Sequence, residues 1–204
     1  MKNRINKVLS ETYINKKIIN INDMYIGTIH SFCFNVLKNN CQNYKNFKIL
    51  NNVTNYLFIK RYHNECGMKE LNLEYNSHNA NLFIKCIEKM VDDYANYDSW
   101  EKNVQDAFNK YKNCIYSKGY FDFSFLIYET VEQLKHHPEF IKNIHYLICD
   151  EYQDVNDLQE KIIEIMYKNG TNICVVGDDD QSIYRIQTEV ILTILLIFQK
   201  NIVM

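Results

Sequence analysis

Two acidic clusters follow short apolar runs in the last third of the chain. Asp150 and Glu151 come directly after the run Ile144–Cys149, and Asp178-Asp179-Asp180 follows Ile173–Val176 after a single glycine. Runs of this kind are typical of buried strands in a parallel sheet. Carboxylates at the ends of such strands suit a hard divalent cation such as Mg²⁺, which takes one or two protein carboxylates plus water and phosphate oxygens.

Three of these residues have chemical roles that fit phosphoryl transfer to water. We expect Asp150 to be the metal-side ligand, directly or through water. Glu151 would point differently and could take a proton from an attacking water molecule. Gln181 both donates and accepts hydrogen bonds, so it could orient that water or sense a terminal phosphate. In such reactions catalysis is mostly positioning and electrostatics.

The sequence between the two clusters predicts a helix that joins two parallel strands. Asn156 precedes Gln159 by three positions, which is a variant of the capping box. The apolar stripe of this helix comprises Leu158, Ile162, Ile165 and Met166, and Gly170 ends it. The strand-helix-strand unit is about 33 residues long, and we expect a right-handed crossover. Both clusters would then lie at the carboxyl edge of the sheet, where α/β folds bind ligands.

The alternative interpretation of each cluster is structural. A single Asp-Glu pair after a strand is commonly a solvated turn or a helix cap, and a run of three aspartates is usually an exposed loop. Two clusters after neighbouring strands favour a metal or phosphate site more than either cluster does alone.

Length and composition exclude several classes of protein. The 204 residues are 47% hydrophobic and 24% charged, with 5 Gly and 1 Pro, which is typical of a folded chain rich in long helices. The seven cysteines are scattered without a C-x-x-C spacing, so we expect free thiols in a reducing, cytoplasmic setting. We find no signal peptide, and the longest apolar stretch, 190–198, is about half of a membrane span. No membrane association is therefore expected.

The charge is distributed unevenly along the chain. Residues 1–62 contain ten Lys or Arg and two acidic residues, although the whole chain has a net charge of −2. A basic third of this kind can bind a polyanion, and a pair of solvated helices is the alternative. Within it, Ile26–Ile29 predicts a short strand, followed by a helix with Phe32, Cys33, Val36 and Leu37 on one stripe.

The two acidic segments resemble motifs II and III of UvrD/Rep/PcrA-type superfamily 1 helicases. The matching segments are Asp150–Asn156 and Val175–Arg185, in the family's order and spacing. The segment Gly27–Phe32 is similar to motif Ib, and Met1–Ile5 looks like the tail of motif Ia. Asp122-Phe123 resembles the dipeptide that re-enters the first RecA-like domain after its inserted subdomain.

This resemblance implies a fold, an activity and a set of site residues. The fold would be α/β, an incomplete RecA-like parallel sheet (domain 1A, residues 1–40 and 119–204) with an all-helical 1B-like insertion at 41–118. The family hydrolyses ATP with Mg²⁺ to move 3′ to 5′ along single-stranded DNA and to unwind duplexes. Asp150 would be the magnesium and nucleotide ligand, with Glu151 as the general base and Gln181 at the γ-phosphate. Thr28, His30, Tyr184 and Arg185 match positions that contact single-stranded DNA.

The chain also departs from the family. It lacks G-x-x-x-x-G-K-S/T, the loop that cradles phosphates. It also lacks the second RecA-like domain, so we expect weak ATP binding and near-background hydrolysis. The missing segments could be encoded separately. Ile186 stands where the family has a stacking aromatic residue. The apolar run 190–198 is expected to dock on a segment outside the chain or to result from a frameshift or a truncated gene.

Two other functions remain open from the sequence. One is a non-catalytic single-stranded-DNA-binding or regulatory module derived from a helicase. The other is a magnesium-dependent phosphatase or nuclease that uses the clustered carboxylates, although neither motif fits this better than a helicase.

Overall fold

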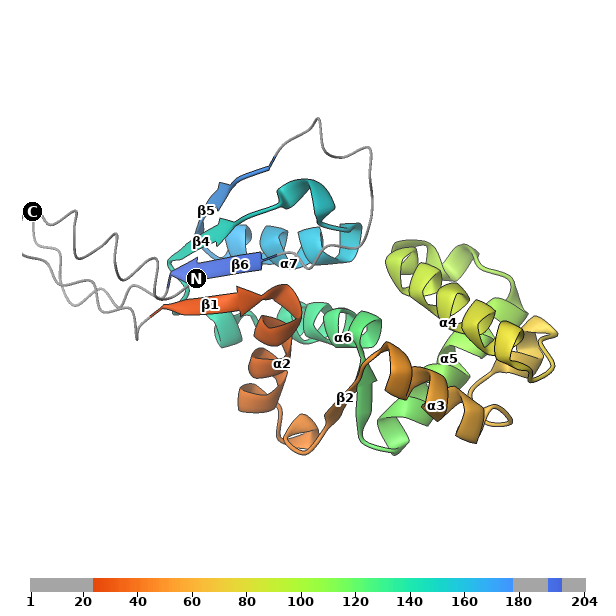
Figure 1. Ribbon diagram of the computed structural model, residues 1–204. Helices are drawn as coiled ribbons and strands as arrows, with labels where there is room; N and C mark the ends of the chain where they lie inside the picture. Colours follow the sequence, from red (N-terminus) through yellow and green to blue (C-terminus); the bar gives the residue numbers. More distant parts are fainter. Residues whose placement is uncertain (1–23, 178–190, 196–204) are drawn as a thin grey trace, which may run out of the picture. The chain divides into compact units, whose positions relative to one another are not determined.

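The computed structural model describes residues 24–177 and 191–195, and the chain divides into two compact units (Figure 1). Unit 1 comprises residues 1–33 and 133–204, and unit 2 comprises residues 34–132. The fold is mixed α/β and mostly helical, with two small sheets. Each unit is described separately below.

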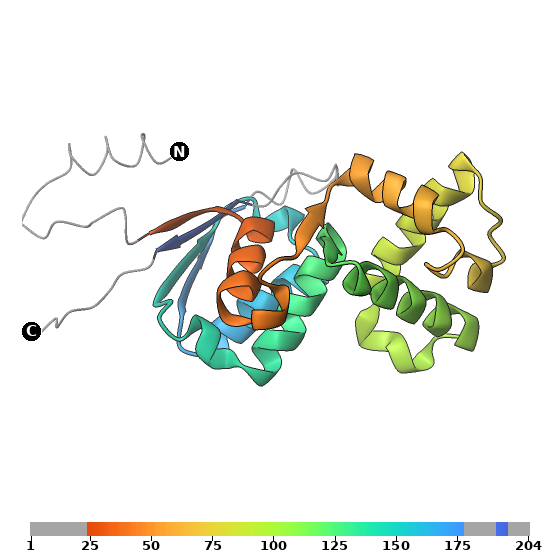
Figure 2. The same cartoon turned by 90° about the horizontal axis from the view of Figure 1, so that it is seen from below.

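Unit 1 contains a four-stranded sheet in the order β1-β6-β4-β5 (Figure 2). Its strands are β1 (Tyr25–Thr28), β4 (Tyr146–Cys149), β5 (Asn172–Val175) and β6 (Ile191–Leu195). The pair β4–β5 is parallel, as the sequence predicts, with Tyr146 opposite Asn172 and Cys149 opposite Val175. Strand β6 is antiparallel to both β1 and β4, so β1 and β4 run in the same direction.

The position of β6 corrects one expectation. The apolar run 190–198 was expected to dock on a segment outside the chain or to result from a frameshift or a truncated gene. Ile191–Leu195 instead pairs with two strands of the same chain, with Ile194 opposite both Tyr25 and Leu147, so docking on an outside segment is wrong for these residues. The frameshift or truncation stays a prediction. An apolar, β-branched segment fits this central position because both of its neighbours satisfy its backbone groups.

Helix α7 (Asp157–Lys168) connects the two parallel strands. The Asn156 side chain accepts a hydrogen bond from the Gln159 backbone, at 2.9 Å, and the Gln159 side chain accepts one from the Asn156 backbone, at 3.3 Å. The predicted capping box is therefore confirmed. Of the predicted stripe, Ile162, Ile165 and Met166 are buried, together with Leu147 and Cys149 of β4. Figure 1 shows α7 beside β4 and β6.

Strand β5 is less buried than its sequence predicts. The run Ile173–Val176 was expected to lie in the interior, but Val175 and Val176 are 47% and 51% exposed. Among the described residues β5 has one neighbour, β4, and so lies at an edge of the sheet. The described part of unit 1 also contains η5, a 3-10 turn at Pro138–Ile141, and η6, another at Tyr152–Asp154.

Unit 2 is built mainly from three helices, α3 (Asn52–Tyr62), α4 (Ser77–Asp92) and α5 (Lys102–Ser117). Strands β2 (Lys48–Leu50) and β3 (Tyr120–Asp122) pair in parallel. In the sequence, β2 precedes the three helices and β3 follows them. Helices α2 (Ile29–Asn40) and α6 (Phe123–His136) each run from one unit into the other. Short 3-10 turns fill the connections: η2 (Gln42–Tyr44), η3 (Met68–Leu71) and η4 (Tyr94–Ser99).

The range 41–118 was expected to be all-helical. It is mostly helical but also includes strand β2. Three residues are enough for a strand here because the Lys48 backbone N–H also donates to the Gly119 carbonyl at 3.0 Å, next to β3. The limits of a 1B-like subdomain at 41 and 118 stay a prediction.

Two buried acids organise the interior of unit 2. Asp122 Oδ1 accepts a hydrogen bond from the Phe125 backbone at 2.7 Å, which caps α6, and Asp122 Oδ2 accepts one from the Tyr111 hydroxyl at 2.7 Å. Both oxygens of Glu129 accept hydrogen bonds from tyrosine hydroxyls, from Tyr44 at 2.7 Å and from Tyr116 at 2.8 Å. Each of these acids is 5% exposed. Burial raises the pKa of Asp122, because it disfavours the charged carboxylate.

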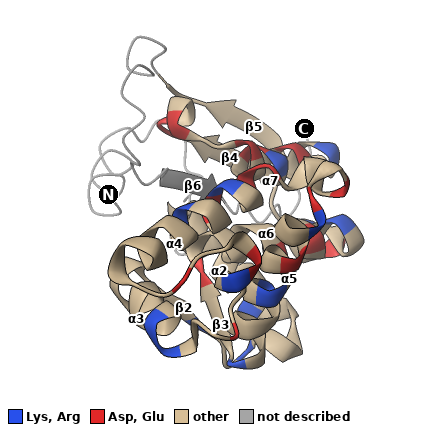
Figure 3. Cartoon of the chain, turned by 90° about the vertical axis from the view of Figure 1, so that its right-hand side faces the viewer, with Lys and Arg blue, Asp and Glu red and all other residues tan. Residues whose placement is uncertain are grey.

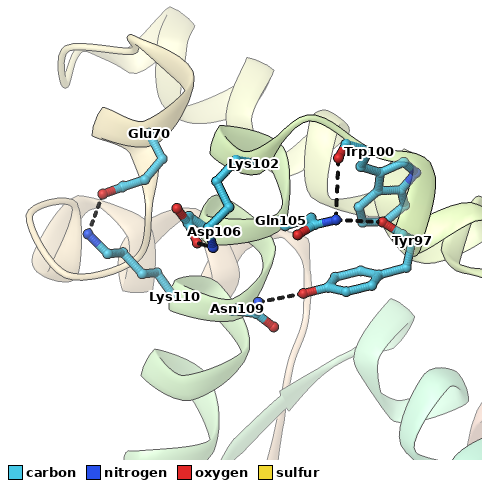
Figure 4. A network of polar contacts seen from close by, with 8 residues as sticks. All are labelled: Glu70, Tyr97, Trp100, Lys102, Gln105, Asp106, Asn109 and Lys110. Carbon is cyan, nitrogen blue, oxygen red and sulfur yellow. Dashed lines mark hydrogen bonds and ion pairs between the residues drawn. The ribbon is translucent and has the colours of Figure 1, made fainter.

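The outer side of α5 binds the preceding turn η4 and the turn η3 (Figure 4). The Gln105 side chain donates to the Tyr97 and Trp100 carbonyls at 3.0 and 3.3 Å, and the Asn109 side chain donates to the Tyr97 hydroxyl at 2.7 Å. Lys110 forms an ion pair with Glu70 of η3. These polar contacts fix the two turns to α5, while Phe108 and Tyr111 on its inner side are buried.

The seven cysteines are all free thiols, as the sequence predicts. Within the described residues, no helix has both the length and the apolar character needed to span a membrane.

Candidate functional site

The carboxyl ends of β4 and β5 are joined by backbone hydrogen bonds. The Val176 N–H donates to the Cys149 carbonyl at 2.8 Å, and the Tyr152 N–H donates to the Val176 carbonyl at 3.0 Å. The segment after β4 therefore stays attached to the end of β5 beyond both strands. The turn after β4, which contains Asp150, Glu151 and Asp154, appears partly red in Figure 3.

The carboxyl end of β1 lies at the same edge of the sheet. Thr28 of β1 is opposite Ile191, and Cys149 of β4 is opposite Leu192, the next residue of the shared neighbour β6. Since adjacent strands are about 4.8 Å apart, the backbones of Thr28 and Cys149 are separated by about 10 Å. The structure thus brings two sequence-predicted groups, Thr28-x-His30 and Asp150-Glu151, to one edge of the sheet.

Asp150 is half-buried directly after β4. Its Oδ1 atom accepts a hydrogen bond from the Glu151 backbone N–H at 3.1 Å, which orients the carboxylate locally. Burial and the neighbouring Asp150 carboxylate raise the pKa of the Cys149 thiol to about 11. The thiol next to the site is therefore protonated near neutral pH and is not a candidate nucleophile.

Glu151 has an unusual backbone conformation. Its φ angle is +55°, in the left-handed region that non-glycine residues rarely adopt, at a cost of about 1 to 3 kcal/mol. Its side chain is exposed, and its Oε2 atom accepts a hydrogen bond from the Gln153 Nε2 group at 2.7 Å. The turn thus brings the Glu151 carboxylate next to the Gln153 amide, and the expected difference in direction from Asp150 stays a prediction.

Sequence reasoning gave no role to Gln153 or Gly177, which the structure places next to the acidic pair. A Cβ atom added at Gly177 would lie 2.6 Å from Gln153 Oε1 and 3.3 Å from the backbone nitrogens of Tyr152 and Gln153. The available signal was a glycine directly after an apolar strand, which often marks a close approach of another backbone.

Thr28 and His30 lie at the start of α2. Thr28 Oγ1 accepts a hydrogen bond from the Ser31 backbone N–H at 3.2 Å and lies 2.9 Å from Ser31 Oγ, so Thr28 caps the helix. His30 is half-buried. The first turn of α2 contains no acidic residue, so its backbone N–H groups and the helix dipole favour an anion such as a phosphate.

The remaining predicted site residues, Gln181, Tyr184 and Arg185, lie outside the described residues. A common edge shared by Asp150, Glu151 and Gln181 therefore stays a prediction.

Binding of Mg²⁺ and ATP would require particular ligands at this edge. No group of three or more His, Cys, Asp or Glu side chains suited to a metal ion occurs in residues 24–177. Mg²⁺ in nucleotide sites needs fewer protein ligands, because water and phosphate oxygens supply the rest, and the half-buried Asp150 fits one such ligand. The phosphate-cradling sequence G-x-x-x-x-G-K-S/T does not occur in the 204 residues.

Comparison with known families defines the class of protein. The model of the UvrD/REP helicase N-terminal domain matches residues 1–201, and the chain belongs to this family. The strand-end acids and the helix start after β1 are thus features of a helicase-family domain.

Individual relatives are DNA helicases by name. The chain is 29% identical over 182 residues to a "Probable DNA helicase" of Mycoplasma pneumoniae, covering 80% of this chain and 34% of that protein. It is 28% identical over 178 residues to "ATP-dependent DNA helicase PcrA" of Bacillus subtilis, covering 80% of this chain and 23% of that protein. The chain is 27% identical over 199 residues to "ATP-dependent DNA helicase PcrA" of Leuconostoc citreum, covering 90% of this chain and 25% of that protein. The chain thus spans about a third or less of these relatives' length.

Proposed function

We propose that the chain is part of the ATP-binding domain of a superfamily 1 DNA helicase, and that it is inactive alone. The family activity is ATP hydrolysis coupled to 3′-5′ translocation on single-stranded DNA and to duplex unwinding. The observation that supports this most is the parallel pair β4–β5, with Asp150 and Glu151 at its carboxyl end and Thr28 at the same sheet edge. Ligands of α/β folds bind at such edges.

Each residue of the edge has a role in this proposal. Asp150 would hold Mg²⁺, directly or through water, and the ion would supply charge neutralisation at the phosphates when bound. Glu151 is exposed and carries two carboxylate oxygens, so it can accept a proton from a water molecule beside it. Gln181 would orient that water or sense the terminal phosphate.

Single-stranded DNA is the proposed partner at the start of α2. Thr28 and His30 would contact the phosphate backbone together with the first-turn N–H groups, which already favour anions. Tyr184 and Arg185 would contribute stacking and cationic contacts. The expected result is binding that weakens steeply as salt concentration rises.

The proposed inactivity of these 204 residues alone is supported by one feature of the sequence. They do not contain G-x-x-x-x-G-K-S/T, the loop that cradles phosphates. We propose that helicase segments encoded separately complete the site. Purified alone, the chain should hydrolyse ATP at background rates, and turnover at ordinary helicase rates would contradict this.

The test uses a chimera in which this chain replaces the matching part of Bacillus subtilis PcrA. ATP hydrolysis is measured with single-stranded DNA present. Glu151→Gln should lower turnover by about 10² or more, the usual contribution of a general base. Glu164→Gln, on the exposed side of α7 between Lys161 and Lys168, is the matched control and should leave turnover unchanged. Equal turnover in both variants would reject the proposed role of Glu151.

The start of α2, whose first turn has no acidic residue, favours a second candidate, a non-catalytic module that binds single-stranded DNA. Such a module would bind a labelled oligonucleotide in a salt-sensitive way, and addition of MgATP would change nothing. Fluorescence anisotropy of the purified chain with and without MgATP, together with the chimera, separates the two functions.

A further inference from the structure

The strand-end acids differ in how they are held. Asp150 is fixed by the backbone that follows it, through the hydrogen bond from the Glu151 N–H. Glu151 is exposed, and its residue adopts the left-handed backbone conformation. An exposed glutamate has several rotamers, so its carboxylate would spread over several positions unless another group holds it.

Gln153 supplies a group of this kind. Its Nε2 amide donates to Glu151 Oε2 at 2.7 Å, a short distance for N–H···O that is typical of a charged acceptor. The two residues are separated by Tyr152 alone, and the left-handed φ at Glu151 turns the chain so that both side chains reach the same place. Gln153 is the middle residue of the three-residue turn η6.

Gly177 leaves open the space in which the Gln153 amide lies. A Cβ atom at position 177 would lie 2.6 Å from Gln153 Oε1, so the flexible end of the Gln153 side chain would have to move away from it. The φ angle of Gly177 is not in the positive range, so its backbone conformation does not itself require a glycine. The Tyr152 N–H to Val176 carbonyl bond holds the two segments at this separation.

We propose that Gln153 is the positioning residue of Glu151, and that Gly177 leaves free the space that the Gln153 amide occupies. The end of β5 would thus set the position of the Glu151 carboxylate through a single side chain. This inference rests on the proposed function for its catalytic meaning, whereas the contact itself can be tested independently of any activity.

The experiment is NMR on the full 204-residue chain labelled with ¹³C and ¹⁵N. Two signals are measured: the coupling across the hydrogen bond between Gln153 Nε2 and the Glu151 carboxyl carbon, and the three-bond couplings that report the Glu151 χ1 rotamer. The wild-type chain should show the first signal and a single χ1 rotamer. Rotamer averaging in the wild type would overturn the proposal.

Three variants test whether Gln153 holds Glu151 by donating a hydrogen bond or only by filling space. Gln153→Glu and Gln153→Met keep the length of the side chain without an amide donor, and both should give averaged Glu151 couplings. Gly177→Ala should give the same result while both partners remain in place, because the new methyl group displaces the amide. A single Glu151 rotamer in all three variants would contradict the proposal.

Tyr152→Phe is the matched control. It removes the Tyr152 hydroxyl bond to Glu160 Oε1, 2.9 Å long, from the residue between the two partners. The Glu151 couplings should not change, and averaging in this variant would show that general loosening of the turn is the cause.

Failure of this inference differs from failure of the proposed function. If Glu151→Gln stops hydrolysis in the chimera but the Glu151 rotamer is independent of Gln153, only the positioning role of Gln153 is rejected. If the rotamer depends on Gln153 but Glu151→Gln leaves hydrolysis unchanged, the contact stands and the catalytic role of Glu151 is rejected.

Discussion

The two units use acidic residues in opposite ways. In unit 2, Asp122 and Glu129 are buried, and every carboxylate oxygen accepts a hydrogen bond from a backbone group or a tyrosine hydroxyl. In unit 1, Glu151 is exposed and Asp150 half-buried, and the bond from Gln153 reaches Glu151 from a neighbouring turn residue. Buried acids with all their oxygens bonded inside the chain stabilise the fold, whereas acids open at a strand end can bind a ligand.

The largest expected effect tests the structural side of this comparison. Asp122→Ala removes the cap of α6 and leaves the buried Tyr111 hydroxyl without its acid partner. Together these losses should lower the free energy of unfolding by about 2 to 4 kcal/mol. Urea denaturation measures it, with Asp98→Ala at an exposed position as the control. A loss equal to that of the control would show that burial does not distinguish the two kinds of acid.

The next effect is a pH dependence of the same residue. Burial raises the pKa of Asp122 above its ordinary value of 3.8, so the folded state binds this proton more tightly than the unfolded chain. That contribution to stability is complete below about pH 4 and is lost as the pH rises through the raised pKa. Its neighbours act in the same direction, since the pKa of Glu88 is also raised by burial and by Asp122, and the Tyr111 hydroxyl is un-ionised.

The variant Asp122→Asn measures this effect because it keeps one acceptor oxygen and cannot titrate. Its stability relative to the wild-type chain should increase as the pH is raised from 4 to 7, in urea denaturation at several pH values. A constant difference across this range would mean that Asp122 titrates alike in the folded and unfolded states.

A smaller effect is expected at the start of α2. Thr28→Ala removes the side chain that accepts the Ser31 N–H and should cost about 1 kcal/mol, whereas Thr28→Ser keeps the hydroxyl and most of the stability. Thermal denaturation gives the stability of both variants. Oligonucleotide binding by the two variants then sharpens the comparison: a residue that only caps the helix would leave the affinity unchanged.

The smallest effect should occur at Glu151. Because this side chain is exposed and accepts its hydrogen bond from another side chain of the same turn, Glu151→Gln should change the free energy of unfolding by less than about 0.5 kcal/mol. A loss comparable to that of Asp122→Ala in the same urea experiment would place Glu151 among the structural acids and would contradict the comparison.

Local patterns in the sequence predicted the strand-helix-strand unit well. The apolar runs before Asp150 and Asp178, and the Asn156/Gln159 capping box, depend on residues close together in the chain. The structure confirms the parallel pairing and the cap, and it places Thr28 and Asp150 at one sheet edge. The family assignment, which rests on motifs of the same short range, is confirmed by the comparison with known proteins.

Features that depend on distant partners were not predictable in the same way. The place of Ile191–Leu195 between β1 and β4 depends on pairing with residues far away in sequence, and the run alone indicates only that it needs neighbours. The contact of Gln153 with Glu151 depends on a positive φ at a glutamate, which no residue pattern signals. The exposure of Val175 depends on what covers β5 in the folded chain, which the apolar character of the run does not indicate.

The antiparallel strand β6 has a consequence for biosynthesis. Thr28 of β1 pairs with Ile191, so the hydrogen-bonding partner of β1 leaves the ribosome long after β1 does. At about 5 to 20 residues per second, the delay is roughly ten to thirty seconds. During translation β1 and β4 would each have an unpaired edge, because β6, the strand that lies between them, is not yet synthesised. Unpaired strand edges of this kind are prone to aggregate until the missing strand is added.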